Sequence, residues 1–129
     1  MLKNKKKPDK STDYKKISSI LRGKACPPFY FFTDIGCYTG KLANSLIDFR
    51  RKIEHLDVKS IQFHCERGDF QRWIKDCVGD FELADKIARI AKKIKGEELR
   101  DEIYQAVDER IRKLKKNDGL NGTSLKHLI

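Results

Sequence analysis

Residues 68–81 read GDFQRWIKDCVGDF, and a Gly-Asp-Phe triplet stands at each end of this stretch. Each glycine is expected to end one helix in a left-handed turn, because it has no Cβ to oppose a positive φ. Asp69 and Asp80 are then expected to cap the first amides of the helices that follow. Between the two corners, apolar residues recur at helical spacing: Phe70, Trp73, Ile74 and Cys77. The stretch predicts a short buried helix at the centre of the core.

Apolar residues at helical spacing continue on both sides of this stretch. They predict a short helix ending at Gly23, a helix carrying Leu42 to Leu56, one from Asp57 to near Gly68, one carrying Leu83 to Ile94, and a last one from Glu97 to Lys116. The aromatic run 25–32 contains two prolines, which forbid a helix there. We find no partner strand for it and therefore expect extended chain crossing a helical core. The predicted fold class is all-α, a small bundle of about five to six helices with one extended aromatic segment before the first long helix.

The chain has 129 residues, of which 39% are hydrophobic, so one small domain is expected. We divide it into a basic flexible arm at residues 1–10, a single helical domain at 11–116 and a C-terminal tail at 117–129. The net charge of +10 is concentrated at the start, because residues 1–24 carry nine Lys and Arg against two Asp. Two further basic groups, at residues 89–95 and 110–116, end the last two helices and would form a patch only if the fold aligned them.

Lysines in the first 16 residues are the candidate nucleic-acid-binding residues: Lys3, Lys5, Lys6, Lys7, Lys10, Lys15 and Lys16. Such an arm would contact phosphates independently of sequence, and its binding would weaken with salt. The alternative is a solubilising tail. Aromatic residues at 29–32, Phe70 and Trp73 are all assigned to the core, so stacking on bases is not expected.

No catalytic or metal-binding set can be assembled from the sequence. Four cysteines, at positions 26, 37, 65 and 77, lack the paired spacing of a zinc site. His64 is interpreted as a partly buried side chain satisfied by a hydrogen bond. Residues 36–41 resemble a phosphate-binding loop, but the glycines are too close and Leu42 follows Lys41. We interpret Thr39 instead as a helix cap and expect no enzyme activity, cofactor or metal.

Several of these residues together resemble an uncharacterised family of small helical domains in archaea and bacteria. The likeness covers residues 25–95 and rests on Phe63-His64, Arg67-Gly68-Asp69-Phe70, Trp73-Ile74, Gly79-Asp80 and Leu83-Ala84, preceded by Phe32, Gly36, Tyr38-Thr39-Gly40-Lys41 and Ser45-Leu46. The resemblance implies a compact helical domain in a prokaryotic cytosol and names no substrate.

The expected function is a non-enzymatic binding module whose basic arm contacts RNA, DNA or a ribonucleoprotein. The alternative is a protein–protein interaction or regulatory domain with no nucleic-acid role. The chain contains no run of about 18 apolar residues, and no apolar stretch follows the lysine-rich start, so we expect a cytoplasmic protein without membrane contact. The oligomeric state is left open.

Overall fold

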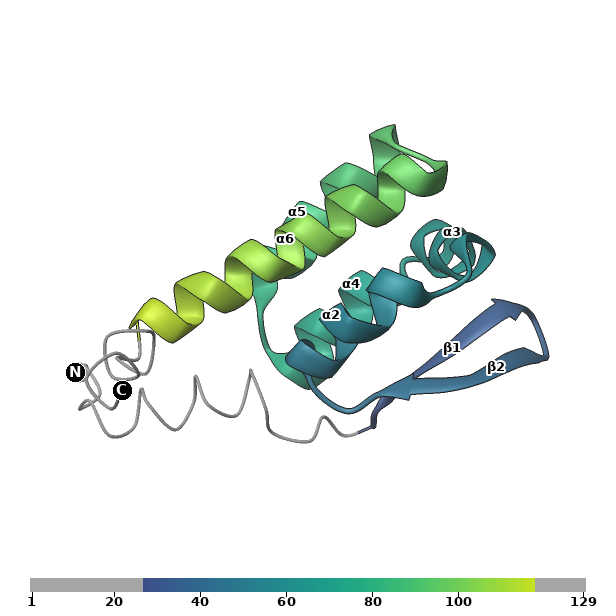
Figure 1. Cartoon of the computed structure of the whole chain (residues 1–129), viewed down its shortest axis with the longest axis horizontal. Helices are drawn as coiled ribbons and strands as arrows, with labels where there is room; N and C mark the ends of the chain where they lie inside the picture. Colours follow the sequence, from purple (N-terminus) through teal and green to yellow (C-terminus); the bar gives the residue numbers. More distant parts are fainter. Residues whose placement is uncertain (1–26, 118–129) are drawn as a thin grey trace, which may run out of the picture.

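A computed structural model of the chain describes residues 27–117. The elements form three layers in Figure 1, with a β-hairpin on one side, α2 to α4 in the middle, and α5 packed beside the long α6 on the other side. Their bounds are β1 Phe29–Asp34, β2 Cys37–Ala43, α2 Leu46–His55, α3 Val58–Arg67, α4 Asp69–Trp73, the π-helix η1 Ile74–Val78, α5 Phe81–Lys93 and α6 Gly96–Asn117. Within residues 27–117, no helix is both long and apolar enough to cross a membrane.

The all-α prediction is wrong, because the aromatic run forms β1 and pairs with β2 in an antiparallel sheet. Asp34 pairs with Cys37, so the two strands are joined by a turn of two residues. The predicted helix from Leu42 begins only at Leu46, where the Ser45 hydroxyl accepts the amide of Asp48 at 3.1 Å. The domain is therefore an α+β fold.

The hairpin is held to the helices by aromatic packing on one of its faces. Phe29 and Phe31 are buried against Phe49, Phe70 and Trp73, with ring centroids 4.9–6.2 Å apart. A two-stranded sheet is marginal alone in water, so this packing supplies the stability that the strands lack.

The two glycine corners are confirmed, but their aspartates behave differently. Gly68 and Gly79 have φ of 76° and 87°, in the left-handed region that favours glycine. Asp80 caps α5 as predicted, since its Oδ1 accepts the amide of Leu83 at 3.0 Å. The prediction for Asp69 is wrong: it is the first residue of α4, and its carboxylate binds side chains instead.

Candidate functional site

An open cleft of about 520 Å³ lies between the hairpin and the helices α3, α4 and η1. Its aromatic lining residues are Phe29, Tyr30, Phe32, Phe63 and Trp73, and its charged lining residues are Asp34, Arg67, Asp69, Arg72 and Asp76. The volume lies within the range of about 300–1,000 Å³ that is typical of small-molecule sites. The π-helix η1 contributes Asp76 and Cys77 to one side, and such irregular turns are frequent at functional sites.

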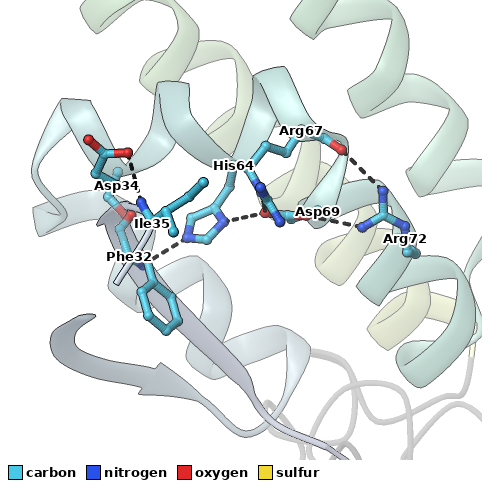
Figure 2. Close-up of polar contacts among 8 residues, drawn as sticks. Phe32, Asp34, Ile35, His64, Arg67, Asp69 and Arg72 are labelled. Carbon is cyan, nitrogen blue, oxygen red and sulfur yellow. Dashed lines mark hydrogen bonds and ion pairs between the residues drawn. The ribbon is translucent and has the colours of Figure 1, made fainter. Parts of the chain in front are cut away.

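His64 contributes to the cleft lining and joins two elements of the fold. It is 3% exposed, and its Nε2 accepts the backbone amide of Phe32 at 2.8 Å. Its Nδ1 lies 2.8 Å from Oδ2 of Asp69 (Figure 2). The Phe32 amide can only donate, so Nε2 carries no proton and Nδ1 donates to Asp69. Burial lowers the pKa of His64, although the hydrogen bond and charge of Asp69 act in the opposite direction. The imidazole is therefore neutral and fixed in one tautomer.

Asp69 links this histidine to two arginines at the mouth of the cleft. Its carboxylate accepts Nε of Arg67 and a terminal nitrogen of Arg72, both at 3.0 Å, and Arg72 also donates to the carbonyl of Arg67 (Figure 2). Burial alone would raise the pKa of Asp69, but the hydrogen bonds from His64, Arg67 and Arg72 outweigh it and lower that pKa. Both arginine side chains remain more than half exposed, so their outer faces are open to solvent.

The imidazole of His64 and the thiol of Cys65 are both buried. Both ring nitrogens of His64 are engaged within the protein, so the imidazole has no free nitrogen to act as a base. Cys65 is buried, which raises the pKa of its thiol to about 12 and makes it a poor nucleophile. Among residues 27–117 there is no group of three or more His, Cys, Asp or Glu that could hold a metal ion.

An exposed aromatic stripe continues from the cleft over the solvent-facing side of the hairpin. It consists of Tyr30, Phe32 and Tyr38; each tyrosine is 45% exposed, and Phe32 is partly buried. The ring of Tyr38 lies 5.8 Å from that of Tyr30 and 5.4 Å from that of Phe32. The prediction that the whole run 29–32 belongs to the core is therefore wrong. Alternation along a strand was the signal, because it places residues 30 and 32 on the face opposite Phe29 and Phe31.

The phosphate-loop resemblance at residues 36–41 does not lead to a phosphate site. These residues form the hairpin turn and most of β2, whereas a phosphate loop opens a helix. Thr39 is not a helix cap: its hydroxyl donates to the carbonyl of Phe31 at 2.7 Å and accepts the amide of Lys41.

The predicted nucleic-acid-binding residues lie outside the described part of the chain. They are Lys3, Lys5, Lys6, Lys7, Lys10, Lys15 and Lys16, and their role stays a prediction. The two basic helix ends are described, and they lie apart. Arg110 near the end of α6 binds Asp80 and Glu82 at the start of α5, so the two helices run antiparallel. The 13 residues of α5 place its basic end about 20 Å away, beyond the Debye length of about 8 Å.

The fold and the cleft define a small α+β domain with an aromatic-lined cleft. Residues 11–108 match a family of unknown function (DUF5752), and the chain belongs to this family. The predicted membership of an uncharacterised family of small domains is confirmed. Comparison with curated proteins and with solved structures gave no match.

Proposed function

We propose that this domain is a non-enzymatic binding module and that the cleft holds a planar aromatic group of its ligand. The observation that carries the proposal is an open cleft of about 520 Å³ that is lined by aromatic side chains and by His64 and Asp69. The hydrogen bonds of His64 are already made within the protein. A ligand therefore gains affinity from contact with flat apolar surfaces and from the groups at the mouth.

Flat surfaces face the cleft from both sides. Tyr30 and Phe32 come from β1, and Phe63 comes from α3. The guanidinium of Arg67 lies over the ring of Phe63, with Cζ 5.2 Å from the ring centroid. Aromatic rings and guanidinium planes both stack on planar groups, so an aromatic ligand fits these walls better than a branched aliphatic one.

The proposed location is the cytoplasm. Cys37 and Cys65 are free thiols, and reduced cysteines are usual in that compartment.

The test is titration of the full chain with 1-anilinonaphthalene-8-sulfonate, an anion that carries a planar naphthalene ring, with binding followed through amide chemical shifts. We expect saturable binding, with shifts concentrated at Phe32, Phe63 and Arg67. Phe63→Ala should weaken binding about tenfold, because one wall is lost. Phe81→Ala is the matched control, since Phe81 is 63% exposed at the start of α5 and does not line the cleft. Equal effects of the two variants, or shifts spread over the whole domain, would refute the proposal.

A second candidate is a protein-interaction domain. It is favoured by the exposure of large apolar side chains, since Ile35 at the hairpin turn is 77% exposed and Phe81 is 63% exposed. A protein partner would contact the hairpin over a wide area. The naphthalene probe alone would then find no single site on this surface, and its binding would not saturate. Saturable binding in the cleft favours the first candidate.

A further inference from the structure

The cleft and the aromatic stripe together offer flat surface for more than one planar group. Phe32 belongs to both, and Tyr38 extends the stripe outward in ring contact with Tyr30 and Phe32. Phe63 of α3 also lines the cleft, and the guanidinium carbon of Arg67 lies over its ring, 5.2 Å from the centroid. A ligand with several flat groups in series would use these surfaces in full, whereas a ligand with one ring would use only the cleft.

Two cationic groups of the cleft lining can meet an anionic part of a ligand. The net charge of +10 is concentrated in residues 1–24, and the lining itself holds two arginines against three aspartates. Arg67 and Arg72 stand at the mouth of the cleft, and both also neutralise Asp69, which is mostly buried. Asp34 and Asp76 remain as exposed acids in the lining, where a carboxylate can accept hydrogen bonds from amino groups.

Resting on the proposed function, we infer that the cleft and stripe bind single-stranded nucleic acid, with one base in the cleft and its neighbours on Tyr30 and Tyr38. A single strand is a polyanion whose flat bases are separated by a flexible backbone, and such strands are bound by aromatic platforms beside positive charge. A duplex hides the faces of its bases in its own stack, so it cannot use these surfaces. The phosphates lie toward Arg67 and Arg72.

The acids in the lining add a preference among bases. Adenine, cytosine and guanine carry exocyclic amino groups that donate to a carboxylate, whereas uracil and thymine carry none. Strands of adenine or cytosine are therefore bound more tightly than strands of uracil or thymine.

The experiment measures fluorescence anisotropy of labelled ten-nucleotide strands of RNA and of DNA, and of a duplex of the same length, with the full chain. We expect each single strand to bind at least tenfold more tightly than the duplex, and the ratio of the RNA to the DNA affinity measures the preference between the two kinds of strand. Tyr38→Leu should weaken single-strand binding about fivefold or more, because one stacking ring is lost. Phe81→Leu is the matched control and should have no effect.

A second comparison of variants separates the contribution of the cleft to binding from that of the predicted arm at residues 1–10. Replacing Lys3, Lys5, Lys6, Lys7 and Lys10 with Gln should reduce the salt dependence of binding while the preference for single strands persists. Tyr38→Leu should lower that preference and leave the salt dependence unchanged.

Failure of this inference can be told from failure of the proposed function. If the naphthalene probe saturates the cleft but single strands bind no better than the duplex, the inference is overturned and the binding site stands. An unchanged affinity of Tyr38→Leu for single strands overturns it as well. If Phe63→Ala retains its fold but loses binding of both the naphthalene probe and the single strands, the inference is supported.

Discussion

Replacing His64 with alanine removes the side chain that joins β1 to α4. The wild-type imidazole accepts the amide of Phe32 on one side and donates to Asp69 on the other, each at 2.8 Å. It also packs between Phe29 and Phe70, with ring centroids at 4.7 and 5.4 Å. The variant therefore loses two hydrogen bonds and a packed ring at a nearly inaccessible position.

The cost follows from these contacts. An unsatisfied buried amide costs about 1–3 kcal/mol, and a hydrogen bond to a charged group contributes about 1.5–3 kcal/mol. Water entering the space left by the ring would restore part of this loss. We expect His64→Ala to lower the free energy of unfolding by about 3–5 kcal/mol. Domains are stable by only about 5–15 kcal/mol, so the change is a large part of the total.

Urea unfolding followed by circular dichroism measures this change as a shift in the midpoint. The matched control is His55→Ala, because His55 is an exposed histidine at the end of α2 whose removal should cost less than about 0.5 kcal/mol. A loss below about 1 kcal/mol in His64→Ala, or equal losses in the two variants, would refute the role assigned to the imidazole.

Three further predictions concern stability. Because the pKa of His64 is lowered in the folded protein, the unfolded chain binds more protons than the folded one below pH about 6.5. The stability present above that pH should therefore fall as the pH drops toward the lower folded pKa. Urea midpoints between pH 7.5 and 5 measure this slope, which should be absent in His64→Gln. Arg110→Ala should lower the free energy of unfolding by about 3 kcal/mol, because it leaves the buried Asp80 without its ion pair. The control Arg112→Ala removes an exposed ion pair on the same helix and should cost less than about 1 kcal/mol. A similar cost for both variants would contradict this prediction. Gly79→Ala should lower the free energy of unfolding by about 1–2 kcal/mol, measured by thermal or urea unfolding. The φ of 87° is the only cause, since a Cβ at this position meets nothing within 4 Å. An unchanged stability would show that the backbone relaxes.

Within residues 27–117, local patterns predicted the helices apart from the start of α2, because helical hydrogen bonds join residues close in sequence. The corner at Gly79 and the cap at Asp80 needed only neighbouring residues, and both are confirmed. The hairpin depended on pairing between separate segments, and Leu42 fits helical spacing with Leu46 as well as strand pairing with Tyr30. Nothing in the local pattern chose between these two structures for residues 37–43.

The two Gly-Asp corners show why the site was harder to predict than the core. Asp69 and Asp80 have the same neighbours on either side, yet only Asp80 caps a helix. The Asp69 carboxylate instead accepts hydrogen bonds from His64, Arg67 and Arg72, which the turn at Gly68 brings close to it. The hydrogen bonding of His64 was predicted correctly, but the side chain is fully rather than partly buried, and its partner on β1 could not be named without the strand.

The same hydrogen bonds that stabilise the domain also fix the walls of the cleft. His64 holds β1 at Phe32, and Asp69 holds Arg67 and Arg72 at the mouth, so the walls are in place before a ligand arrives. A preformed site spends less binding free energy on ordering its own side chains. Stability and affinity should therefore fall together in His64→Gln, whereas Tyr38→Leu, on the exposed stripe, should lose affinity for single strands at unchanged stability. A His64→Gln variant that is destabilised but binds the naphthalene probe as tightly as the wild type would show that the cleft does not depend on this network.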